Sequence, residues 1–140
     1  MINDRELIHL AIAAADHAYV PYSHFCVGAA LLCEDGTVYQ GANIENAAYP
    51  VCHCAERTAL VRAVFEGRQK FNKIAIVGKH EDAPRYGICA PCGVCRQALR
   101  EFTDPDSFQV LLATSEEDYE VYSLSQLLPL GFTGADMDPE

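Results

Sequence analysis

Residues 49–60, YPVCHCAERTAL, place three potential metal ligands in a row: Cys52, His53 and Cys54. Glu56 follows two residues after the last of them. Cysteine sulfur and histidine nitrogen are ligands that zinc takes in proteins. A carboxylate beside a zinc-bound water is what a hydrolase needs to move protons. The stretch therefore indicates a zinc centre, with Glu56 as a candidate proton carrier.

A second cysteine group, Cys92 and Cys95, lies in the sequence PCGVC. Residues three apart share one face of a helix, so these two thiols can bind one ion together. Pro91 favours the first turn of a helix. The dipole at a helix start stabilises the thiolate, which is the form that binds zinc. We therefore expect both cysteine groups at helix starts that face one shared ion.

Two kinds of zinc site fit these residues. A structural site is closed by four protein ligands, whereas a catalytic site keeps one position for water. Cys52, Cys54, Cys92 and Cys95 would make a closed site, and three of them with water would make a reactive one. Glu56 favours the reactive site, because its charge beside a closed anionic cluster would be costly.

The choice between the two upstream cysteines stays open at this point. Cys52 and Glu56 are four residues apart and share a helix face, whereas Cys54 and Glu56 are two apart and do not. Cys54 can bind the ion only if it lies at the helix cap, outside regular helical geometry. Arg57 could offset part of the negative charge by donating hydrogen bonds to the thiolates.

Hydrophobic periodicity and turn signals predict the elements that must position these residues. We expect helices at 4–18, 52–66 and 91–102, strands at 25–33, 37–44, 73–79 and 107–115, a short fifth strand at 120–124 and a short helix at 125–129. The order is helix, hairpin, then alternating strands and helices. It predicts an α/β fold, a three-layer α/β/α sandwich around a central mixed five-stranded sheet.

The 140 residues suit a single domain spanning 1–140, with a loose acidic tail at about 134–140. A formal net charge of −10 and no cluster of Lys and Arg disfavour a nucleic-acid partner. No apolar stretch reaches transmembrane length, and no secretory leader is recognisable, so we expect no membrane partner and a cytoplasmic protein. In that reducing compartment the seven cysteines are expected to bind metal more often than to form disulfides.

The motif CAE followed by PCGVC resembles the signature of the zinc-dependent nucleoside and nucleobase deaminases. PYSHFCVGAALL, GANIENAAYPVCHCAERTAL, PCGVCRQALREF and LLPLGF are together similar to the small, homotetrameric cytidine deaminases. The resemblance runs from about residue 4 to 133. It implies the cytidine deaminase-like version of the predicted fold. It also implies hydrolytic deamination of cytidine and 2′-deoxycytidine to uridine and 2′-deoxyuridine plus ammonia, in pyrimidine salvage.

The resemblance also implies a metal site and a catalytic residue. Cys54, Cys92 and Cys95 match the ligands of one Zn²⁺ per chain. Glu56 matches the catalytic glutamate that moves protons between water, ring and departing amine. Arg57 matches the arginine that donates hydrogen bonds to the zinc thiolates. Cys52 and His53 have no metal role in this pattern.

Four residues match the family's substrate contacts within one chain. Asn43 and Glu45, in NIEN, resemble the pair that binds the ribose hydroxyls. Phe25 resembles the aromatic residue that stacks near the base. Ala55 resembles the residue whose backbone faces the pyrimidine ring.

Three further residues imply sites at subunit interfaces of a homotetramer. Ala47 and Tyr49 match the loop that enters a neighbouring subunit's site. Phe132 matches the C-terminal aromatic residue that closes the site across an interface. The expected partners are thus a nucleoside and other copies of this chain.

Three alternatives remain open from the sequence. One is a deaminase of another small aminopyrimidine, such as a blasticidin-type antibiotic, which usually lacks the NIENAAY loop. Another is a deaminase of RNA or DNA, which the acidic charge disfavours. The third is a non-catalytic zinc module with four cysteine ligands that include Cys52.

Overall fold

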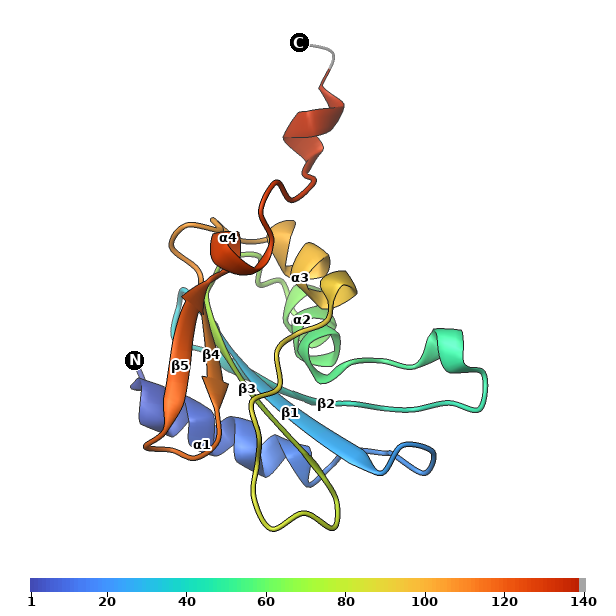
Figure 1. Ribbon diagram of the computed structural model, residues 1–140. Helices are drawn as coiled ribbons and strands as arrows, with labels where there is room; N and C mark the ends of the chain where they lie inside the picture. The colour runs from blue at the N-terminus through green and yellow to red at the C-terminus, as the bar shows by residue number, and fades with distance from the viewer. Residues whose placement is uncertain (139–140) are drawn as a thin grey trace.

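Five strands form one mixed sheet in the computed structural model of the chain, which describes residues 1–138 (Figure 1). The strands are β1 (Phe25–Cys33), β2 (Val38–Ala42), β3 (Phe71–His80), β4 (Gln109–Ala113) and β5 (Tyr119–Ser123). Their order across the sheet is β2-β1-β3-β4-β5. β3 and β4 pair in parallel, and the other neighbours are antiparallel. The prediction of a mixed five-stranded sheet is confirmed.

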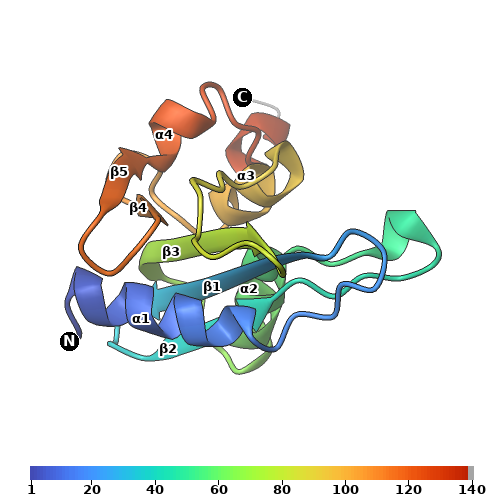
Figure 2. The ribbon, with the colours of Figure 1, turned by 60° about the horizontal axis from the view of Figure 1, so that its bottom comes forward.

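Helices cover both faces of this sheet. They are α1 (Asp4–Ala15), α2 (Ala55–Phe65), α3 (Gly93–Arg100) and α4 (Leu124–Leu127), with 3₁₀ helices η1 (Tyr49–Val51) and η2 (Gly134–Met137). Figure 2 shows α1 in front of the sheet and α2 behind it, and α3 lies on the same side as α2. The predicted three-layer α/β/α sandwich is confirmed.

The sheet buries a separate apolar cluster on each face, and β1 contributes to both. Leu31 and Cys33 pack with the α2 side, whereas Ala30 and Leu32 pack with the α1 side. Successive side chains of a strand point to opposite faces, so a strand covered on both sides must be apolar throughout. Burying one leucine side chain contributes about 1.5–3 kcal/mol. This explains why the run FCVGAALLC predicted its strand correctly.

A glycine in β2 allows the start of α2 to lie directly on the sheet. A Cβ atom at Gly41 would collide with the backbone of Ala55 and Ala59. Because a hydrogen takes the place of this Cβ, the first turn of α2 reaches the strand itself. This close contact fixes the distance between the first turn of α2 and the sheet.

The main helix boundaries differ from the predictions by a few residues. α2 begins at Ala55 rather than 52 and α3 at Gly93 rather than 91, because Cys54 and Cys92 are N-caps with extended backbone. α1 ends at Ala15 rather than 18. Gly67 follows the C-cap of α2 with a φ of 95°, a backbone conformation that suits glycine best.

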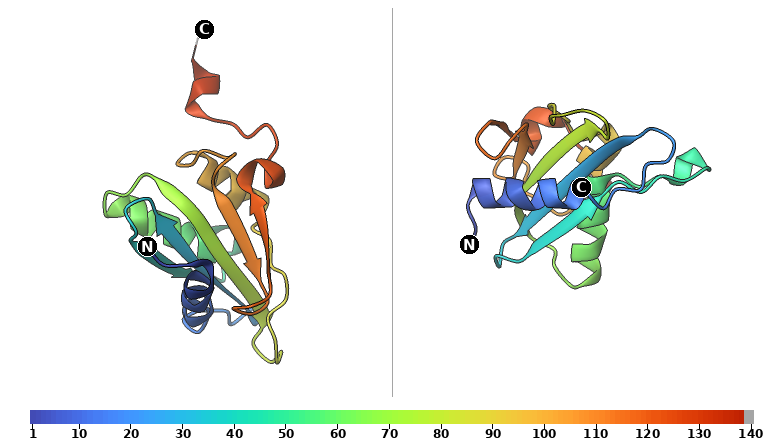
Figure 3. Two further views of the ribbon diagram at one scale, coloured as in Figure 1. Left: turned by 90° about the vertical axis from the view of Figure 1, so that its left-hand side faces the viewer. Right: turned by 90° about the horizontal axis from the view of Figure 1, so that it is seen from below.

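The C-terminal segment leaves the body of the domain after α4 (Figure 3). Its expected acidic tail, 134–140, begins with η2, which has no buried residue. Residues 139–140 lie outside the described part of the chain. Within residues 1–138, no helix combines the length and apolar character required to cross a bilayer.

Candidate active site

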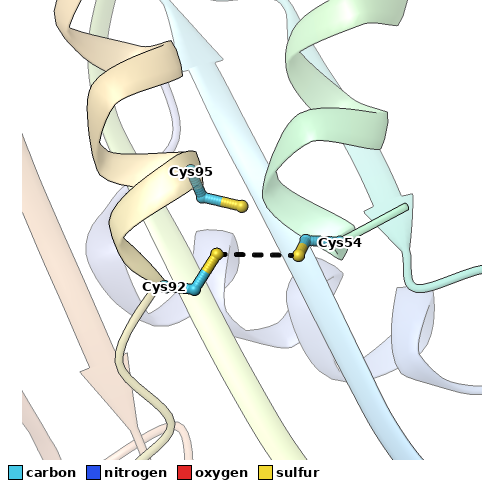
Figure 4. A group of neighbouring side chains, drawn as sticks. All are labelled: Cys54, Cys92 and Cys95. Carbon is cyan, nitrogen blue, oxygen red and sulfur yellow. Dashed lines mark hydrogen bonds between the residues drawn. The ribbon is translucent and has the colours of Figure 1, made fainter. Parts of the chain in front are cut away.

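Three cysteine thiols converge where α2 and α3 begin (Figure 4). Cys54 caps α2, Cys92 caps α3, and Cys95 lies in the first turn of α3. Their sulfur atoms lie within 4.8 Å of one another, and Cys54 Sγ is 3.8 Å from Cys92 Sγ. The expected meeting of the two cysteine groups is therefore present in the fold.

This thiol group has the chemistry and spacing of a zinc site. Tetrahedral coordination at a Zn–S distance of about 2.3 Å separates two sulfur ligands by about 3.8 Å. The Cys54–Cys92 separation already has this value. Soft thiolate ligands favour zinc over the hard cations magnesium and calcium. Three protein ligands also leave one position open, as in a catalytic zinc site.

Cap geometry settles the position of Cys54. Its φ and ψ are −74° and 154°, so it lies outside the regular helix, as ligation by this residue requires. Cys52 is engaged elsewhere. Its Sγ accepts a hydrogen bond from Asn46 N–H at 3.3 Å. The same thiol donates to the Asn46 carbonyl oxygen at 3.6 Å. Within residues 1–138, Cys52 is not a member of the convergent thiol group, which disfavours the four-cysteine alternative.

Arg57 brings a positive charge to the thiols. Its Nη2 donates to Cys54 Sγ at 3.6 Å and to the Cys52 carbonyl oxygen at 3.4 Å. The pKa of the guanidinium is raised, chiefly by its hydrogen bond to the Cys54 sulfur. Its Nε is the one buried side-chain nitrogen or oxygen without a partner in the described residues. A buried donor at this position favours the thiolate form of the neighbouring cysteines. Thiolate is the form in which cysteine binds a metal ion.

The thiols also affect one another. The pKa of Cys54 falls to about 5, first because Cys95 donates a hydrogen bond to its sulfur and then because Arg57 does. The pKa of Cys95 is raised, because it is the donor in that bond and because it is buried. The group therefore holds a negative charge near neutral pH, which attracts a cation.

Glu56 is the one buried charged residue within residues 1–138, with 4% of its surface exposed. It lies in the first turn of α2 and makes no ion pair within the described chain. Its pKa is raised, first by burial and also by the nearby Cys54 thiolate. A buried carboxylate without a basic partner costs stability, so its position is typical of a functional group.

A cavity of about 280 Å³ opens beside these residues. Its walls include Cys54, Cys92, Glu56 and three of the predicted substrate contacts, Asn43, Glu45 and Ala55. The wall also contains Val27, Cys52, His53, Cys89 and Ala90. Its size approaches the lower end of the range of small-molecule pockets, about 300–1,000 Å³.

Asn43 is anchored to the start of β1, and Glu45 is anchored to the segment that leads into β1. The Asn43 side chain accepts from Val27 N–H at 2.9 Å and donates to the Phe25 carbonyl oxygen at 2.8 Å. Glu45 Oε1 accepts the backbone N–H groups of Tyr22 and Ser23 at 3.0 and 3.1 Å. The two residues are therefore held in fixed positions at the cavity wall.

Four predicted contacts lie outside the cavity wall in the described chain: Phe25, Ala47, Tyr49 and Phe132. Tyr49 is 68% exposed and Phe132 57% exposed. Tyr49 lies on the projecting loop with η1 (Figure 1), where its ring contacts that of Tyr22 at a centroid distance of 5.9 Å. In one chain, the exposed Tyr49 and Phe132 side chains therefore do not close the cavity.

The sequence analysis did not identify two residues that hold other parts of the site in place. The Gln97 side chain donates to the Phe132 carbonyl oxygen at 2.7 Å and accepts from its N–H at 3.2 Å, which ties the C-terminal segment to α3. Ser23 contacts Glu45 through both its backbone and its hydroxyl. Their presence in the motifs CRQ and PYSHF was the available signal.

Comparison with known proteins agrees with this geometry. The family "Cytidine and deoxycytidylate deaminase zinc-binding region" matches residues 1–111. The chain is 46% identical to a cytidine deaminase of Sporosarcina psychrophila, over 94% of this chain and 93% of that protein. It is 48% identical to a cytidine deaminase of Halalkalibacterium halodurans, over 96% and 98% of the two chains.

Solved structures give the same result. The crystal structure of cytidine deaminase from Burkholderia pseudomallei matches with a TM-score of 0.84 and 44% identity, covering 94% of this chain and all of that one. The cytidine deaminase from Mycobacterium tuberculosis matches with a TM-score of 0.79 and 34% identity, covering 94% and 98% of the two chains.

Proposed function

The chain belongs to the cytidine and deoxycytidylate deaminase family, and from that premise we propose that it hydrolyses cytidine and 2′-deoxycytidine to uridine and 2′-deoxyuridine plus ammonia. The observation that carries the proposal is the buried Glu56 beside three convergent thiols, in a cavity walled by Asn43 and Glu45. We place this reaction in pyrimidine salvage, in the cytoplasm.

Cys54, Cys92 and Cys95 hold one Zn²⁺ per chain in this proposal. The ion, when bound, supplies Lewis acidity and makes a water molecule easier to deprotonate near neutral pH. Three thiolates donate much negative charge. Arg57 and the starts of α2 and α3 offset part of it, because each presents positive charge or N–H dipoles to the sulfur atoms.

Glu56 carries the protons. It accepts one from the attacking water and delivers it to N3 of the pyrimidine ring, while the water oxygen bonds to C4. It next transfers the second water proton to the exocyclic amine. The C4–N4 bond breaks, ammonia leaves, and a carbonyl remains at C4. A carboxylate buried at the cavity wall suits this role, because bulk water is excluded from both transfers.

Recognition of the nucleoside comes from the cavity wall and from Phe25, whose backbone bonds to Asn43 of that wall. Asn43 and Glu45 bind ribose hydroxyls, Phe25 stacks near the base, and the backbone of Ala55 faces the ring. When the sugar is missing, the polar side chains that would bind its hydroxyls are left unpaired. This cost in binding free energy disfavours the free base. The protein is therefore expected to use cytidine in preference to cytosine.

Neighbouring copies of the chain complete the site as a homotetramer. The exposure of Tyr49 and Phe132 supports this assembly, since large aromatic side chains at such positions are typical of interfaces. Ala47 and Tyr49 enter a neighbouring site, and Phe132 closes one. Light scattering tests the assembly, with an expected mass of four times the 15.4 kDa chain.

The test of function follows the ultraviolet band of cytidine with purified, zinc-replete protein and with Glu56→Gln. Native protein should remove the band and release ammonia, and the variant should bind zinc yet leave the band almost unchanged. A native protein that holds about one zinc per chain but converts no cytidine would contradict the substrate assignment. Equal turnover by the variant would contradict the role of Glu56.

A further inference from the structure

The Ser23 hydroxyl lies between Glu45, a residue of the candidate sugar site, and the backbone of Phe25. It donates a hydrogen bond to Glu45 Oε2 and accepts one from the backbone N–H of Phe25 at 3.0 Å. Ser23 and Glu45 are 22 residues apart in the chain. One hydroxyl thus links the carboxylate at the cavity wall to the backbone of the predicted stacking residue.

The acceptor capacity of Glu45 is nearly filled by this segment. A carboxylate offers about four lone-pair directions. Oε1 receives two backbone N–H groups, from Tyr22 and Ser23, and Oε2 receives the Ser23 hydroxyl. One direction, on Oε2, is left for an outside donor. Glu45 lines the cavity, so a ligand hydroxyl there can provide that donor.

We propose that Ser23 is a positioning residue for sugar recognition: its hydroxyl orients the Glu45 carboxylate so that one acceptor direction of Oε2 faces a single sugar hydroxyl. The inference rests on the proposed function, because it assigns Glu45 to the sugar. It makes Ser23 a determinant of nucleoside affinity that touches no reacting atom.

Electrostatics supports the same arrangement. The pKa of Glu45 is lowered, and the hydrogen bond from the Ser23 hydroxyl is the largest cause, followed by backbone N–H groups and the nearby His24. Burial raises the pKa of the nearby Cys26 thiol, and the negative charge of Glu45 adds to this rise. Glu45 therefore stays ionised, and an ionised carboxylate is the stronger acceptor for a sugar hydroxyl.

Steady-state kinetics on Ser23→Ala and Ser23→Thr test the proposal. Ser23→Ala should raise KM for cytidine about tenfold, the size expected for one hydrogen bond to a charged group, with kcat within about twofold of native. Ser23→Thr keeps a hydroxyl and should restore most of the affinity. In a Glu45→Ala background, Ser23→Ala should cause no further increase in KM for cytidine, because the two residues act through one contact.

Ser115→Ala is the matched control. The Ser115 hydroxyl also accepts a backbone N–H two residues ahead, from Glu117 at 3.3 Å, but it lies in the β4–β5 turn. Its removal should leave KM unchanged. If Ser23 only stabilised its local turn, Ser23→Ala would lower the melting temperature without changing KM, and the proposal would be wrong.

Carboxyl ¹³C titration of Glu45, assigned by difference from Glu45→Gln, gives a readout independent of turnover. Ser23→Ala should raise the pKa of Glu45, and an unchanged pKa would overturn the orienting contact. Native protein that turns over no cytidine would reject the proposed function, and the titration would still decide whether Ser23 orients Glu45. Native turnover with an unchanged KM in Ser23→Ala would reject the positioning role alone.

Discussion

Cys54 and Glu56 reach the same cavity although they are two residues apart, because Cys54 is the N-cap of α2 and Glu56 lies in its first turn. Inside a regular helix, residues at this spacing point in different directions. The extended backbone of Cys54 removes the conflict. A metal ligand and a proton carrier can therefore share one short sequence motif.

Cysteine-to-serine variants should separate the three-thiol site from the four-cysteine alternative. Cys54→Ser removes a convergent thiol and should abolish stoichiometric zinc. Cys52→Ser alters a thiol that contacts the Asn46 backbone and should retain about one zinc per chain. Metal analysis of the purified variants measures both. Zinc loss from Cys52→Ser equal to that from Cys54→Ser would contradict the three-thiol site.

Glu56→Gln should lower kcat by about 10²–10⁴-fold, the usual contribution of a general acid–base group. The amide has almost the same shape, so zinc content and the free energy of unfolding should not decrease. Metal analysis and urea denaturation provide these controls. A large loss of stability would mean that Glu56 is needed for folding and would leave the kinetic loss without a catalytic interpretation.

Gly41→Ala should destabilise the fold and loosen the metal site. Its Cβ meets the backbone of Ala55 and Ala59, which cannot move without shifting the start of α2. Overpacking of this kind costs about 1–3 kcal/mol. Urea denaturation measures the cost, and Gly134→Ala, where no atom lies within 4 Å of the new Cβ, is the control. Equal stability of the two variants would refute the steric role of Gly41.

Acid should remove a stabilising contribution from the β1–β2 turn. The pKa of Asp35 is lowered, chiefly because the Thr37 N–H donates to its Oδ1 at 3.0 Å, with further help from Arg68. A carboxyl with a lowered folded-state pKa stabilises the protein above its unfolded value, about 3.9, and this stabilisation is lost as pH falls through the folded-state pKa.

Asp35→Asn should therefore lower the free energy of unfolding at pH 7, and the gap from native protein should close as pH falls below about 4. Urea denaturation at a series of pH values measures the gap. Glu34→Gln is the control, since Glu34 makes no ion pair within residues 1–138. A gap that stays constant down to pH 2 would show that the Asp35 charge does not contribute.

Local sequence was sufficient for much of the fold. The apolar run at 25–33 predicted β1 with its observed bounds, and helical periodicity predicted α1. These features depend on residues close together in the chain, whose preferences are set by backbone sterics and by burial. The predicted roles of the substrate-contacting residues rest on resemblance and remain predictions.

Only the tertiary structure placed the three thiols beside one another and showed what holds the cavity wall. Spacing left Cys52 and Cys54 as rivals, and only the point at which α2 begins on the sheet beside Gly41 placed Cys54 at the cap. The contact between Ser23 and Glu45 joins segments 22 residues apart. Sequence periodicity describes one element at a time, whereas these contacts arise from how different elements pack.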